Sequence, residues 1–199
     1  MFIYKYMSHP GLNCPSELFS SLHDLTHLRL QADRGASLNE VIRPITRNIF
    51  ANISQFEPSE WSEFYFLPDA PEVTTLATIF QISVALYGLF TLPATNVPLP
   101  CGCSSKTELR DKLFELIKQL WNTPGCRYTL NWPIALLGFS LKEDGSQADR
   151  DLVLIWLACL ASDLTVTQPS TIEAKLRTFW ASGLSQWEDC WQEPFVVIC

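Results

Sequence analysis

The sequence has 199 residues, of which 47% are hydrophobic and 18% are charged. This composition excludes a disordered chain, a collagen and a coiled-coil rod, and the length suits one domain with a substantial core. The net charge is −7, from 14 basic and 21 acidic residues, so direct binding to nucleic-acid phosphates is disfavoured.

The amino-terminal residues and the seven cysteines bear on the compartment. Met1–Tyr6 lacks the apolar run of a signal peptide, and Pro10 and Gly11 follow closely. Thiols in a chain that is not exported have no reason to pair. We therefore expect reduced, mostly buried cysteines and a location in the cytoplasm or the nucleus.

Helix signals recur along the whole chain. A serine followed three residues later by an acidic residue is a typical helix start. Such signals occur at Ser37–Glu40, Ser105–Glu108, Ser146–Asp149 and Ser170–Glu173. Together with apolar spacing, they predict helices near residues 16–32, after Ser37, and near 106–121, 132–142, 147–163, 171–182 and 184–192. We predict an all-α, single-domain orthogonal helical bundle that comprises residues 1–199.

Two of these helices have clear apolar stripes at a spacing of three or four residues. A proline at position 44 must either kink the helix after Ser37 or mark its first turn. The Phe195–Ile198 segment alternates too briefly to found a sheet. The stripes comprise Leu18, Leu22, Leu25 and Leu28 in the first helix, and Leu109, Leu113, Leu116, Ile117 and Leu120 in the other.

The segment Val73–Leu92 is uncharged and long enough to cross a bilayer. It also carries a small or polar stripe that includes Thr74, Thr78 and Gln81. No Lys or Arg flanks the segment to mark a cytoplasmic side. We therefore expect a central helix buried by its neighbours and no membrane span.

Two short patterns could suggest metal binding. His23 and His27 lie one helical turn apart with Asp24 between them, as in zinc-protease helices, but a third ligand is not identifiable. Cys101 and Cys103 lack the second pair that a structural zinc site needs. We predict a polar helix face and a loop with two incidental thiols, and therefore no metal and no cofactor.

Seven tryptophans are the unusual feature of the composition. They indicate either core packing with a protein interface, or an aromatic-lined cavity for a hydrophobic small molecule. Tyr87 and Gln81 lie six residues apart, so they do not share one narrow helix face. The residues that could line such a cavity are Thr78, Gln81, Tyr87, Trp132, Trp180 and Trp187.

A family resemblance begins with the run Trp132–Gly138, a Trp-Pro pair followed by apolar residues and a glycine. With the helix Arg150–Leu160 and the segment Ala174–Trp180, it resembles the carboxyl-terminal regulatory region of fungal-specific transcription factors. Two further segments are similar to this family's usual sequence, Ala85–Tyr87 and Leu109–Phe114. The resemblance covers about residues 72–192 and implies a helical regulatory domain from a fungus.

The sequence departs from that family in lacking its DNA-binding zinc cluster, since no Cys-x-x-Cys occurs. Much of the family's usual amino-terminal regulatory half is also missing, and the acidic charge agrees with the loss of DNA reading. The resemblance implies a regulatory or interaction domain without its own DNA-binding module, linked to specialised metabolism and acting on a protein partner.

An enzyme is the alternative function. The sequence contains no nucleophile elbow, phosphate-binding loop or dinucleotide fingerprint, so it identifies no catalytic residue. A cofactor-free cyclase or isomerase, such as a pericyclase of the Diels–Alderase kind, would need only a shaped apolar cavity and a few hydrogen-bond donors. Its substrate would be a hydrophobic polyketide or terpenoid intermediate of a fungal biosynthetic cluster.

Overall fold

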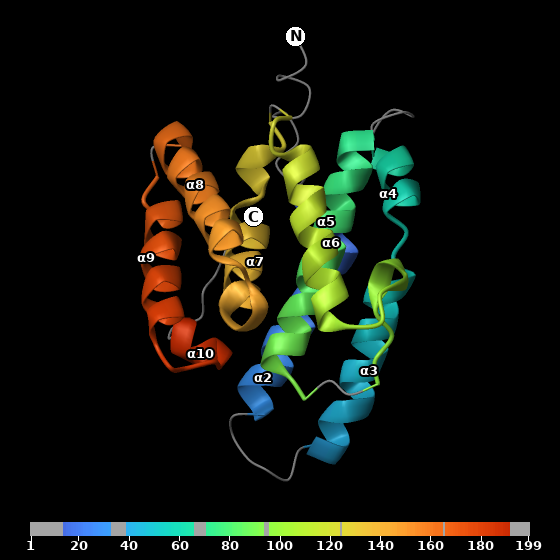
Figure 1. The fold of residues 1–199 in the computed structure, drawn as a ribbon. Helices are drawn as coiled ribbons and strands as arrows, with labels where there is room; N and C mark the ends of the chain where they lie inside the picture. The colour runs from blue at the N-terminus through green and yellow to red at the C-terminus, as the bar shows by residue number, and fades with distance from the viewer. Residues whose placement is uncertain are drawn as a thin grey trace. The chain divides into compact units, whose positions relative to one another are not determined.

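The structure is a computed structural model that describes residues 14–32, 39–65, 71–93, 96–123, 125–164 and 166–191. Nine α-helices and two short 3-10 turns make up the regular structure of these residues, with no strand among them. The predicted all-α class is therefore confirmed (Figure 1). Contacts divide the chain into two compact units, Met1–Leu120 and Trp121–Cys199. That they form a single domain stays a prediction.

The first unit is organised around helix α5 (Pro71–Thr91). This helix contacts every other helix described in the unit, and also the 3-10 turn η2 (Pro100–Gly102). Figure 1 shows α5 in green with its neighbours around it. Those neighbours are α2 (Ser16–Ala32), α3 (Asn39–Gln55), α4 (Pro58–Tyr65) and α6 (Lys106–Leu120).

The sequence of α5 explains its central position. By length and composition alone it could cross a membrane, but 72% of its most apolar stretch is buried within the protein. Gly88 permits close packing, because a Cβ there would lie 2.8 Å from the Phe50 ring and 3.2 Å from the Leu25 side chain. Such burial is that of a core helix, as predicted, and it implies no membrane span.

The two predicted stripes are largely confirmed. In α2, Leu18, Leu25 and Leu28 are buried, whereas Leu22 is only half-buried. In α6, the four residues Leu109, Leu113, Ile117 and Leu120 are buried and Leu116 is half-buried. Phe114 is also buried although the stripe did not include it.

The second unit is built on α7 (Asn131–Asp144), which contacts α8 (Gln147–Leu164) and α9 (Gln168–Ala181). The turn η3 (Arg127–Thr129) precedes α7, and α10 (Trp187–Cys190) packs on α9. Every residue of α7 from Asn131 to Phe139 is buried.

Gly138 explains how closely α7 and α9 can pack. A Cβ at this position would lie 2.4 Å from a methyl group of Leu176 and 3.3 Å from one of Val153. Any larger side chain would force those neighbours to move. The glycine of the Trp-Pro motif thus serves helix packing within the second unit.

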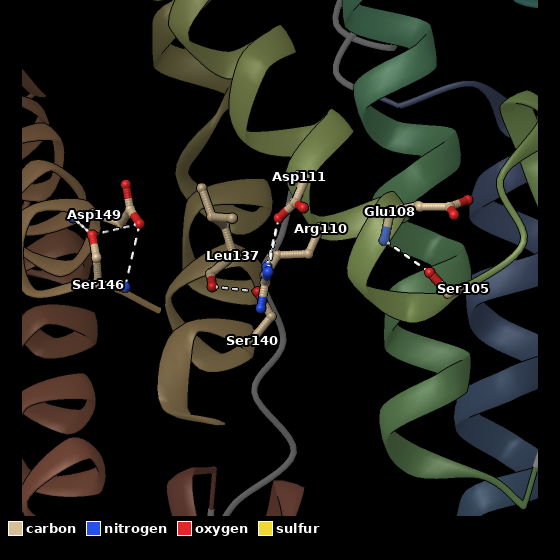
Figure 2. A network of polar contacts seen from close by, with 8 residues as sticks. All are labelled: Ser105, Glu108, Arg110, Asp111, Leu137, Ser140, Ser146 and Asp149. Carbon is tan, nitrogen blue, oxygen red and sulfur yellow. Dashed lines mark hydrogen bonds and ion pairs between the residues drawn. The ribbon is translucent and has the colours of Figure 1, made fainter. Parts of the chain in front are cut away.

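Two of the predicted helix starts are confirmed (Figure 2). The Ser105 hydroxyl accepts a hydrogen bond from the Glu108 amide at 3.1 Å. The Ser146 hydroxyl accepts one from the Asp149 amide at 3.1 Å, and the Asp149 carboxylate accepts one from the Ser146 amide at 3.3 Å. Each contact satisfies a backbone donor that a helix leaves unpaired.

Other local predictions were wrong or lie outside the described residues. Helix α9 begins at Gln168 with Pro169 in its first turn, so Ser170 lies inside the helix and does not start it. Pro44 lies inside α3 and beyond its first turn, so the first-turn alternative was wrong and the kink stays a prediction. Helix α4 was not predicted. Ser37 and the Phe195–Cys199 segment lie outside the described residues.

Candidate interaction surface

Gln81 is the most constrained of the predicted cavity residues. Its side chain is buried in the first unit, and its Nε2 donates to the carbonyl oxygens of Ile53 at 2.7 Å and Phe56 at 2.9 Å. Its Oε1 lies 3.8 Å from the Cys101 Sγ, which donates to it. The amide therefore fixes the end of α3 and the start of α4.

Thr78 and Tyr87 also use their hydroxyl groups within the unit. The Thr78 hydroxyl donates to the Thr74 carbonyl at 2.8 Å. The Tyr87 hydroxyl lies 3.1 Å from the Thr26 hydroxyl and accepts from Arg29 at 3.4 Å. Gln81 therefore faces the α3–α4 junction, whereas Tyr87 faces α2. The three candidate donors make internal contacts with different partners, which gives the cyclase alternative no support.

The structure also places the residues of the two metal-like patterns. Within the described residues, no group of three or more His, Cys, Asp or Glu side chains could hold a metal ion. The His23 and His27 rings stack with centroids 6.5 Å apart on the exposed face of α2. Burial raises the pKa of the Cys101 and Cys103 thiols, although Lys112 opposes that effect.

The three candidate tryptophans lie in the second unit. Trp132 and Trp187 are each 5% exposed. The Trp180 indole donates to the Gly138 carbonyl at 2.9 Å. Trp187 belongs to α10, and its ring centroid lies 5.0 Å from that of Phe139 and 5.8 Å from that of Trp191. These tryptophans therefore pack the second unit, in keeping with core packing.

Cationic side chains close the helix ends beside these tryptophans. The Lys142 ammonium donates to the carbonyl oxygens of Phe179 at 2.7 Å, Trp180 at 3.1 Å and Ser182. Arg150 donates to the Leu141 carbonyl at 3.0 Å and to the Lys142 carbonyl at 3.0 Å. A helix end carries partial negative charge, so these contacts stabilise the carboxyl ends of α7 and α9.

With the predicted residues in internal contacts, the exposed apolar side chains are the candidate interaction surface. Two groups stand out by their surroundings. Helix α8 exposes Ile155 within the uncharged run Leu152–Ser162, and α4 exposes Phe64 among glutamates. Among the residues that the structure describes, the exposed large apolar side chains are Phe19, Leu30, Ile45, Phe64, Tyr128, Ile155, Val166 and Leu184.

Helix α4 is the functional candidate that sequence reasoning missed. Trp61 is buried with Val73 and Ala77 of α5, and Phe56 packs against this cluster. Phe64, on the same helix, is 80% exposed. The signal was the interleaving of acidic and aromatic residues from Glu57 onward, which helix-period analysis does not weigh.

Comparison with known proteins identifies the family. The profile described as "Fungal specific transcription factor domain" matches residues 2–194, further toward the amino terminus than the resemblance at 72–192. A phomenoic acid biosynthesis cluster-specific transcriptional regulator from Leptosphaeria maculans is 27% identical over 197 residues. That match covers 96% of this chain and 37% of the relative. No solved structure matches. The chain belongs to the fungal-specific transcription factor domain family.

Proposed function

We propose that this chain is the regulatory domain of a transcriptional regulator that controls a gene cluster of specialised metabolism. The observation that carries the proposal is the family match over residues 2–194, together with the similar cluster-specific regulator. The chain spans 37% of that relative, so the regulator's further activities are part of the proposal.

The domain contributes protein contacts rather than DNA contacts. Its net charge is −7, and its sequence contains no Cys-x-x-Cys pair of the kind found in the family's zinc cluster. The polar groups of Gln81 and Tyr87 make internal contacts, whereas apolar side chains such as Phe64 and Ile155 are exposed. The exposed apolar side chains and the family together favour a protein partner in the nucleus.

The test is replacement of the native gene by a null allele, with transcripts of the neighbouring biosynthetic genes and their metabolites both measured. Loss of the transcripts, restored by the wild-type gene, is the expected result. Normal transcripts with accumulation of an uncyclised precursor would contradict the regulator and favour the cyclase. A fluorescent fusion that is excluded from the nucleus would contradict the proposed location.

A further inference from the structure

Helix α4 lies in the longest stretch of the chain that has no basic side chain. Between Arg47 and Lys106 the sequence contains no Lys, Arg or His. The same stretch contains five acidic residues, which all fall within residues 57–72: Glu57, Glu60, Glu63, Asp69 and Glu72. The local charge is therefore strongly negative.

The structure places this charge around an exposed aromatic ring. Glu57, Glu60 and Glu63 are exposed, and Phe64 is 80% exposed on the same helix. Glu63 and Phe64 lie three and four residues after Glu60, so these three share one side of the helix, and Glu57 is the last residue before α4. We call these four residues the α4 acidic face. Burial of an exposed phenyl ring in a partner supplies stabilisation that contact with solvent does not.

Two buried residues of α4, which are not part of this face, hold the helix in place. Trp61 is 8% exposed and Ser62 is 3% exposed, and the Trp61 ring is buried with Val73 and Ala77 of α5. Gln81 fixes the preceding junction through its bond to the Phe56 carbonyl at 2.9 Å. The acidic face is therefore presented on an ordered helix, which lowers the entropy that binding must overcome.

We infer that the α4 acidic face docks onto a protein of the transcription machinery that has an apolar pocket rimmed by Lys and Arg. The pocket receives the Phe64 ring, and the rim pairs with Glu57, Glu60 and Glu63. Charge complementarity selects this occupant, because nucleic acid and anionic membranes carry the same sign as the face. The inference rests on the proposed function.

Phe19 provides a matched comparison within the same unit. It is also a phenylalanine on a helix and is 56% exposed. Its own helix α2, however, carries histidines and an arginine beside its acids, so it lacks the uniform negative rim. If substitution of Phe64 weakens partner binding and substitution of Phe19 does not, the effect is therefore due to the α4 acidic face and not to exposed aromatic side chains in general.

The test joins the full 199-residue chain to a bacterial DNA-binding repressor that has no activating function, upstream of a reporter gene in yeast. The wild-type fusion should activate the reporter. Phe64→Ala and the double variant Glu60→Gln with Glu63→Gln should each lower the output roughly tenfold, the effect of losing a central contact. Phe19→Ala and the double variant Asp24→Asn with Asp151→Asn should leave it unchanged. Equal fusion levels and melting temperatures show that the variants fold.

Each other outcome overturns the inference. A wild-type fusion that fails to activate excludes an activating partner, while the gene-replacement test of the proposed function still stands on its own. Full activity of Phe64→Ala excludes docking through the ring. Loss with Phe64→Ala but full activity of the glutamate variant excludes a basic rim. Equal losses with Phe19→Ala exclude a site specific to α4.

Discussion

Helix α5 of the first unit and helix α7 of the second are both buried along most of their length, but polar groups serve them differently. In α5, neutral side chains point outward and bind neighbouring helices: Gln81 binds the α3–α4 junction and Tyr87 contacts α2. In α7, donors from other helices come to its carbonyl oxygens, as Trp180 does at Gly138 and Arg150 does at Leu141.

The two helices also differ in the charge of their last turns. Helix α5 has no basic residue in its last turn, and its polar contacts lie along its length. Helix α7 has Lys142 in its last turn, and that ammonium binds the carboxyl end of α9. The neutral amide of Gln81 satisfies carbonyl groups deep in the first unit. In the second unit, the charged side chains of Lys142 and Arg150 satisfy carbonyl groups at helix ends, which lie nearer to water. Buried charge is costly, so this distribution is the favourable one.

The largest effect should come from the apolar part of α7. Trp132 is 5% exposed, and Trp132→Ala would leave a cavity costing about 3–5 kcal/mol of unfolding free energy. Urea unfolding measures it, with Tyr128→Ala (40% exposed) as the control. An unchanged midpoint would show that Trp132 does not hold the core.

If the chain is the predicted single domain, amides of α5 and α7 should lose hydrogen-exchange protection together.

In the first unit, the largest polar effect should come from Gln81. Gln81→Leu removes the donor of two buried contacts and leaves the Ile53 and Phe56 carbonyls without it. We expect a loss of about 2–4 kcal/mol in urea unfolding, because each unpaired buried group costs about 1–3 kcal/mol. Thr78→Val removes only a bond within one helix and should cost much less. Equal costs for the two variants would contradict the role given to Gln81.

Lys142 is the corresponding test in the second unit. Lys142→Met keeps the apolar stem but removes the ammonium that binds three carbonyl oxygens at the end of α9. Water can reach a helix end, so we expect a smaller loss of about 1.5–3 kcal/mol. Lys118→Met, at an exposed pair with Glu115, is the control and should cost well under 1 kcal/mol. A loss no larger than that of the control would show that Lys142 does not cap α9.

The helical spacing of apolar residues predicted correctly the features that depend on which side of a helix is buried. The stripe of α6 and the bounds of α2 are confirmed, because the position of a side chain around the helix determines whether it is buried or exposed. The start of α9 was missed because Pro169, which favours a first turn, outweighed the Ser170 signal. Helix α4 was missed because eight residues give too little periodicity.

The candidate site was harder to predict than the fold. Thr78, Gln81 and Tyr87 were singled out as candidate cavity residues, which stays a prediction, and the sequence does not state which groups of neighbouring segments their polar atoms meet. The Gln81 contacts join residues 28 and 25 positions apart in the chain. Trp187 packs on Phe139 for the same reason, since only the fold brings α10 to α7.

The smallest expected effect concerns a thiol of the second unit and depends on pH. Burial raises the pKa of Cys190 from 9.0 to about 12, although Lys175 opposes the shift. The unfolded chain therefore ionises this thiol first as the pH rises, so the stability contributed by the neutral thiol is complete below pH 9 and is lost progressively between pH 9 and 12. At pH 10 the loss should be up to about 1.4 kcal/mol of unfolding free energy. Cys190→Ala abolishes this titration, so the difference in unfolding free energy between pH 8 and pH 10 should be smaller in the variant than in the wild type. Cys103→Ala, at a half-buried thiol of the first unit, should change that difference much less. Identical pH dependence in the wild type and Cys190→Ala would show that the thiol reaches water in the folded chain.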